Sequence, residues 1–203
     1  MNAIETRPRV ENIVASTQFA KELDLCTVAE KLRGSEYEPE RFPGLIYRLS
    51  DPKTAILLFG SGKANCTGGK SLEEARRAIR KLAELLNKSG IPVDSDPEIT
   101  VQNMVAVYDV GCALNLTNLT ISLGLEDIEY EPEQFPGLVY RVRDPDVVCL
   151  VFGSGKMVVT GARSDKDIER AVDRVLQVIR EHGLLRSETV GSKNEAAEAG
   201  AKT

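Results

Sequence analysis

The chain has 203 residues, a formal net charge of −5 and 42% hydrophobic residues, which suit one large or two small globular units with a proper core. Its four cysteines have none of the spacings of a zinc site, so we expect reduced, buried thiols and no metal or other cofactor. No apolar run approaches about 18 residues, and no basic-then-apolar leader is present. These totals favour a soluble intracellular protein without a membrane partner.

The first element expected is a strand. Apolar and polar residues alternate over residues 10–16, and a counterpart lies at 100–107. After it, Asp24 can cap a short helix that ends near Leu32. In the later stretch, Asn115 or Thr117 can cap the equivalent helix.

Three short strands and a long helix are expected next. Turn residues separate the three runs of strand composition, at 44–49, 54–59 and 63–67. The short links between them favour an antiparallel meander. Ser71, with Glu74 three residues later, is a capping-box start for a helix that ends near Gly90. Ser164 and Asp167 begin its counterpart.

These elements belong to an internal repeat. Residues 36–71 align with residues 129–164 at an offset of about 93, with identity at roughly 22 of about 36 positions. Because one unit of this size buries little core, we expect two copies packed as an intramolecular pseudo-dimer with a pseudo-two-fold axis. A surface facing that axis is a doubled site, which suits a nearly two-fold ligand such as duplex DNA.

One face of the sheet is expected to stay uncovered. Each long helix has a single apolar stripe, so the helices can cover only the other face. Residues two apart in a strand share a face, and the uncovered set is apolar or weakly polar. A patch of this size usually marks a binding surface. The structural alternative is that this face closes a barrel or a homodimer.

The motifs occur in the same order in both copies. N-I-V-A-S, Y-E-P-E-R-F-P-G-L-I-Y-R and F-G-S-G-K-A-N-C-T-G-G-K return as Q-N-M-V-A-V, Y-E-P-E-Q-F-P-G-L-V-Y-R and F-G-S-G-K-M-V-V-T-G-A-R. This series resembles the TATA-binding protein family, archaeal type, over residues 7 to 184. The resemblance implies an α+β saddle, an intramolecular pseudo-dimer with a curved ten-stranded antiparallel sheet and four helices on its convex face. Residues 7–92 and 98–184 are then the two repeats, and 186–203 a disordered tail.

The resemblance also implies a function. It indicates a general transcription initiation factor, not an enzyme, that binds the minor groove of TATA-box DNA at the nucleoid in the cytoplasm of an archaeal cell. The family is itself a standard example of proteins that kink DNA with inserted side chains. Carried over by position, the wedge pairs are Phe42 with Phe59 and Phe135 with Phe152.

Base and phosphate contacts follow from the same resemblance. Asn12 and Asn103 are expected to donate to adenine N3 and thymine O2, which the minor groove exposes. The other base-contacting residues are Val14, Val105, Leu57, Leu150, Asn65, Val158, Thr67 and Thr160. Asn65 departs from the family pattern, which has an apolar residue there, as the second copy does. The expected phosphate contacts are Arg48, Lys63, Arg141, Lys156, Lys70 and Arg163.

The resemblance also implies partner proteins, and the residues leave an alternative function open. Glu131, Glu133 and Gln134 resemble the segment that meets transcription factor B, which links the protein indirectly to RNA polymerase; an acidic loop can also simply be solvated. A binder of single-stranded nucleic acid that stacks the four phenyl rings on bases is the alternative function. The negative net charge argues mildly against nucleic acid, although placement of the cations matters more. The sequence leaves open a homodimer of the DNA-free protein.

Overall fold

A single antiparallel sheet forms the body of the computed structural model, which describes residues 7–123 and 125–183. In this described part the sheet has ten strands in the order β2-β3-β4-β5-β1-β6-β10-β9-β8-β7. The first copy supplies β1 (Arg9–Gln18), β2 (Ser35–Glu36), β3 (Leu45–Ser50), β4 (Lys53–Leu58) and β5 (Lys63–Gly69). The second supplies β6 (Ile99–Asp109), β7 (Ile128–Glu129), β8 (Gly137–Arg143), β9 (Asp146–Phe152) and β10 (Lys156–Ala162).

The two copies join through their first strands. β1 and β6 pair antiparallel at the centre of the sheet, and Ile13 lies opposite Met104. Asn12 then faces Val105, and Val14 faces Asn103. Asn12 and Asn103 are equivalent positions in the two copies, and so are Val14 and Val105. The pairing is therefore the same when the two copies are exchanged, as a pseudo-two-fold axis requires.

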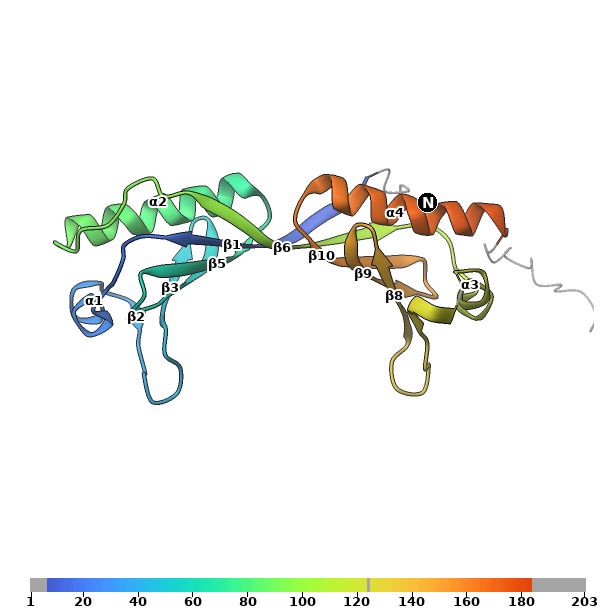
Figure 1. Ribbon diagram of the computed structural model, residues 1–203, viewed down its shortest axis with the longest axis horizontal. Coiled ribbons are helices and arrows are strands. Elements are labelled where there is room, and N and C mark those ends of the chain that lie inside the picture. Colours follow the sequence, from blue (N-terminus) through green and yellow to red (C-terminus); the bar gives the residue numbers. More distant parts are fainter. Residues whose placement is uncertain (1–6, 124, 184–203) are drawn as a thin grey trace, which may run out of the picture.

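The helices lie on one side of the sheet. α2 (Leu72–Lys88) and α4 (Asp165–Glu181) run along the upper face in Figure 1, while α1 (Leu25–Lys31) and α3 (Leu116–Leu123) lie at the two outer ends. With a short 3-10 turn, η1 (Leu125–Asp127), these are the helices of the described residues. Two loops extend below the sheet in Figure 1: the β2–β3 connection, residues 37–44, and the β7–β8 connection, residues 130–136. We call them the first and second stirrup loops. The predicted saddle with four convex-side helices is confirmed.

Local signals set most helix starts. Asp24 Oδ1 accepts a hydrogen bond from Cys26 N at 3.0 Å, and Ser71 Oγ accepts one from Glu74 N at 3.1 Å. The Glu74 carboxylate accepts from Lys70 N, one residue before the cap, at 2.8 Å. For α3 the cap is Asn115, whose Oδ1 accepts from Asn118 N at 3.2 Å. The sequence alone had not decided between Asn115 and Thr117 as the cap of this helix.

The core lies between the helices and the convex face of the sheet. Strand residues on that face, such as Ala15, Ile56 and Val151, are fully buried. The expectation of buried thiols holds for Cys66 and Cys149 only. Cys26 is exposed because it lies on the outer side of α1, and Cys112 is half-buried. All four are free thiols.

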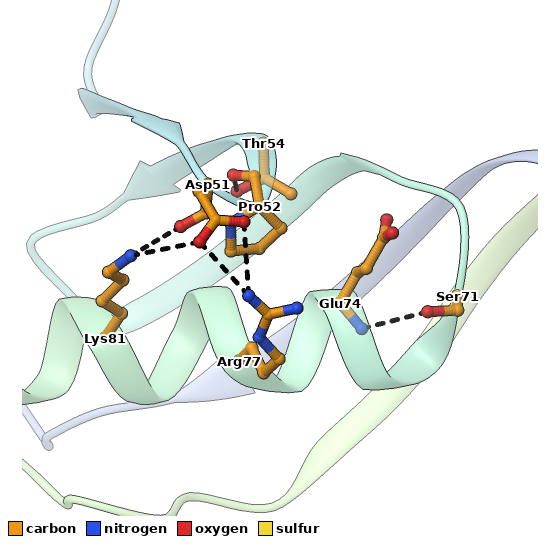
Figure 2. Close-up of polar contacts among 7 residues, drawn as sticks. All are labelled: Asp51, Pro52, Thr54, Ser71, Glu74, Arg77 and Lys81. Carbon is orange, nitrogen blue, oxygen red and sulfur yellow. Dashed lines mark hydrogen bonds and ion pairs between the residues drawn. The ribbon is translucent and has the colours of Figure 1, made fainter.

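The β3–β4 turn is tied to α2 by polar contacts (Figure 2). Both carboxylate oxygens of Asp51 lie 3.3 Å from Arg77 Nη2, and Lys81 Nζ donates to Asp51 O at 2.7 Å. In the second copy, Arg170 Nη2 lies 2.8 Å from Asp144 Oδ2. The same contact therefore joins the meander to its long helix in both copies.

Some boundaries differ from prediction. β4 ends at Leu58, so Phe59 lies just beyond it, and β5 continues to Gly69 through a bulge. The two-residue strands β2 and β7 are too short to show any periodicity in the sequence. The predicted tail at 186–203 lies outside the described residues. Within the residues that the structure describes, no helix is both long and apolar enough to cross a membrane.

Candidate nucleic-acid interface

The concave face of the sheet carries the residues expected to contact bases. All ten are partly exposed, whereas their strand neighbours, such as Ile13, Ile56 and Met157, are buried under the helices. The alternation that the sequence predicts is therefore present in both copies. The ten residues are Asn12, Val14, Leu57, Asn65, Thr67, Asn103, Val105, Leu150, Val158 and Thr160.

The two central asparagines are held in one orientation. Asn12 Oδ1 accepts from Gly68 N at 2.8 Å, and Asn103 Oδ1 accepts from Gly161 N at the same distance. These donors are available because β5 and β10 bulge at glycines with φ of 100° and 95°. A Cβ at Gly68 would also lie 3.0 Å from Lys53 O. Among the described residues neither Nδ2 group has an acceptor, so each amide presents donors outward.

Two phenyl pairs lie at equivalent places in the two copies. The ring centroids of Phe42 and Phe59 are 6.0 Å apart, and those of Phe135 and Phe152 are 5.8 Å apart. Their interplanar angles of 65° and 67° are edge-to-face arrangements, which aromatic pairs prefer. Phe135 is 39% exposed and the other three are half-buried. The fifth phenylalanine, Phe19, is only 2% exposed and belongs to the core.

Sequence reasoning missed the glycines on which these rings rest. A Cβ at Gly44 would lie 2.7 Å from Phe42 Cε1 and 3.0 Å from Phe59 Cε1. At Gly137 the corresponding distances to the Phe135 and Phe152 rings are 2.7 and 2.9 Å. Both rings of each pair therefore lie against a bare Cα. The repeated F-P-G triplet was the signal that could have identified this site.

The expected phosphate-binding cations fall into two groups. Lys63, Lys156 and Arg163 are exposed and have no side-chain ion pair within the described residues. Arg48, Arg141 and Lys70 are paired with carboxylates: Arg48 with Glu36 at 3.3 Å, Arg141 with Glu129 at 3.1 Å and Lys70 with Glu11 at 2.7 Å. Exposed pairs are weak, so a phosphate can replace each carboxylate. Hydrogen bonding from Lys70 lowers the pKa of Glu11 below its ordinary value.

The two stirrup loops share a shape but differ in charge. In the second loop, Phe135 N donates to Glu131 O at 2.9 Å and the Gln134 side chain donates to the Glu131 carboxylate. In the first loop, Arg41 occupies the place of Gln134 and forms an ion pair with Glu38 at 3.0 Å. Glu38 is thus neutralised and the exposed Glu40 leaves the first loop with one negative charge, whereas Glu131 and Glu133 give the second loop two.

The concave face is also hollowed in its second half. A hollow of about 480 Å³ is lined by Val107, Phe152 and Val158 together with Arg9 and Lys156. Arg9 was not expected at this face; it also forms an ion pair with Glu11 at 2.8 Å. In the described part of the chain, no three His, Cys, Asp or Glu side chains gather in a way that could hold a metal ion.

These features define an internally duplicated, saddle-shaped protein whose open face repeats its amide, aliphatic and phenyl groups about a pseudo-two-fold axis. Comparisons with known proteins agree with this class. The sequence model of the family described as "Transcription factor TFIID (or TATA-binding protein, TBP)" matches residues 7–89 and 98–182. The chain therefore belongs to the TATA-binding protein family.

Individual relatives are similar over nearly the whole described length. The TATA-box-binding protein of Thermoplasma volcanium is 58% identical over 176 residues, which cover 87% of this chain and 96% of the relative. That of Archaeoglobus fulgidus is 52% identical over 177 residues, covering 87% and 97%. The solved structure of Methanococcus jannaschii TBP superposes with a TM-score of 0.80 at 52% identity and covers 86% of this chain and 99% of that one.

Proposed function

We propose that this protein is a transcription initiation factor that binds TATA-box DNA in the minor groove through its concave face and kinks the duplex with its two phenyl pairs. The observation that carries the proposal is the placement of partly exposed Phe pairs at equivalent positions on either side of an aliphatic floor with central amide donors. The names of the similar proteins, TATA-box-binding protein, support it.

The aliphatic and amide residues between the two phenyl pairs suit the minor-groove edges of A·T pairs. In the minor groove, A·T and T·A both present only acceptors, adenine N3 and thymine O2, whereas guanine adds an amine donor. The Nδ2 groups of Asn12 and Asn103 can donate to these acceptors, because each Oδ1 is already occupied by a backbone N–H. A guanine amine placed against Val14 or Val105 would lose its hydrogen bond with water and gain none.

The phenyl pairs suit the work of a wedge. Opening a base step costs a few kcal/mol, and an apolar ring restores part of the lost stacking contact. Each pair is already assembled in the free protein, since both rings rest on one glycine. Pyrimidine–purine steps unstack most easily, so deformability adds to the preference for TATA-like sequences.

The cations and the second stirrup loop indicate further contacts. Lys63, Lys156 and Arg163 are available for phosphates, and Arg48, Arg141 and Lys70 become available when phosphate replaces their carboxylates. Glu131, Glu133 and Gln134 form an acidic surface beside Phe135 that suits a basic partner touching the same DNA, which we assign to transcription factor B. RNA polymerase is then recruited through that factor.

Binding and bending of duplex DNA test the proposal. A gel shift at two salt concentrations should show tight binding to a TATA duplex and weak binding to a scrambled duplex of equal composition. Energy transfer between dyes at the two ends of the TATA duplex should rise on binding, because a kink shortens the end-to-end distance. Unchanged transfer, together with stronger binding to single strands, would instead favour stacking of the four rings on unpaired bases.

A further inference from the structure

The two halves of the concave face differ in polarity along one row of residues. In the first copy, Asn65 lies between Leu57 on β4 and Ser16 on β1 as cross-strand neighbours. In the second copy, Val158 lies in the same way between Leu150 on β9 and Val107 on β6. The outer leucines match, but a polar pair, Ser16 and Asn65, stands where the other half has two valines.

The polar pair is accessible and its hydrogen-bonding groups are available. Both side chains are partly exposed on the concave face. Ser16 Oγ accepts from Gln102 Nε2 at 2.7 Å, which leaves the hydroxyl hydrogen free to donate. Asn65 has no side-chain hydrogen bond with the other described residues. Since directly opposite strand residues have Cβ atoms about 4.5–5.5 Å apart, the two groups can address the same base pair.

We propose that Ser16 and Asn65 form a base-reading pair that accepts a G·C pair in the half of the DNA element under the first copy. This inference rests on the proposed function. Asn65 Oδ1 can accept from the guanine N2 amine, the one donor that the minor groove offers, while Asn65 Nδ2 or the Ser16 hydroxyl donates to the neighbouring cytosine O2. The equivalent valines in the second copy offer the same amine no acceptor and exclude guanine.

A directional preference follows from this difference. On a palindromic A·T element the protein has two equivalent orientations, because rotation of the DNA exchanges the two halves. One G·C pair in one half makes them unequal, and the first copy should then lie over it. A single base-edge contact supports a preference of about tenfold, near the lower end of the discrimination expected from such contacts.

Orientation can be measured with a dye on Cys26. This thiol is exposed on α1 at the outer end of the first copy (Figure 1). Cys112 is replaced by Ser, and Cys66 and Cys149 are buried, with burial raising their pKa to about 11 and about 12, so they stay unlabelled. An acceptor dye is placed at either end of the duplex. On the unmodified palindrome, transfer to the two ends must be equal, which calibrates the assay.

The expected result is about tenfold enrichment of the orientation that places Cys26 beside the G·C-bearing end. The double variant S16V/N65V should bind that duplex equally in both orientations. Adding V107S/V158N to the double variant should reverse the preference, a result that misfolding cannot produce. Equal energy transfer to both ends of the G·C-bearing duplex, measured with Ser16 and Asn65 unchanged, would overturn the proposal. Failure of the proposed function is a separate result, because it would appear as unbent or unbound DNA on the unmodified palindrome.

Discussion

Replacement of Gly137 by alanine tests whether the phenyl rings act as a preassembled wedge. The new Cβ would lie 2.7 Å from Phe135 Cε1 and 2.9 Å from Phe152 Cε1, and ordinary contact begins at 3.4 Å. Both rings must therefore move. The backbone at Gly137 is not in the left-handed region, so alanine adds no backbone strain. The substitution therefore moves the two rings without removing either phenyl group.

The magnitude follows from the contacts that are disturbed. An edge-to-face pair is worth about 0.5–1.5 kcal/mol beyond its buried area, and a displaced ring restores less of the stacking that costs a few kcal/mol per opened step. We therefore expect a loss of about 1–2 kcal/mol in binding, or roughly 5- to 30-fold in affinity for TATA duplex. The free energy of unfolding should change by less than about 1 kcal/mol, because alanine also reduces the freedom of the unfolded chain.

The assay combines titration of end-labelled TATA duplex, read by energy transfer, with thermal unfolding. Gly153→Ala is the matched control, since a Cβ there has Leu114 O at 3.8 Å as its nearest neighbour. Wild-type affinity and bending in Gly137→Ala would refute a preassembled wedge. Equal losses in Gly137→Ala and Gly153→Ala would attribute the effect to the local backbone instead.

Three further predictions concern the wedge, the cations and an ion pair. Changing Phe135 and Phe152 together to Ala should reduce affinity and bending on TATA duplex far more than on mixed-sequence DNA, and equal loss on both would count against insertion. Lys156→Ala should weaken binding to both DNAs and flatten the salt dependence by roughly one ion; an unchanged slope would remove this lysine from the phosphate contacts. Arg80 lowers the pKa of Asp96 through a hydrogen bond. The Arg80–Asp96 pair therefore stabilises the fold above the pKa that Asp96 has in the unfolded chain, and this stabilisation is lost as the pH falls through the pKa of Asp96 in the folded protein. Asp96→Asn should flatten the acid limb of the free energy of unfolding against pH, and an unaltered limb would contradict the pairing.

Local chemistry explains which features could be predicted. The caps at Asp24, Ser71 and Ser164 depend on groups within three residues, so their sequence signals were sufficient. The alternation that places Val14 and Leu57 on the concave face is a property of any strand. The family resemblance supplied the roles expected of the four phenylalanines, and in the structure these side chains form two edge-to-face pairs at equivalent positions.

Contacts between distant residues could not be predicted in the same way. The pairing of Arg48 with Glu36 joins residues 12 apart across a turn, and nothing in the local pattern distinguishes it from a free arginine. The support of two rings by Gly44 depends on the meeting of a loop with the end of β4. The exposure of Cys26 depends on which side of α1 faces the core.

The sequence by itself determined the duplication, the order of elements within each copy and the alternation of faces along each strand, because these depend on neighbours in the chain. Only the tertiary structure decided how the copies meet. β1 pairs with β6 edge to edge, in a register that sets Ile13 against Met104, and this pairing consists of backbone hydrogen bonds that any residue except proline can form. Because the copies join at strand edges, neither concave face is used in joining them, and the doubled surface remains open.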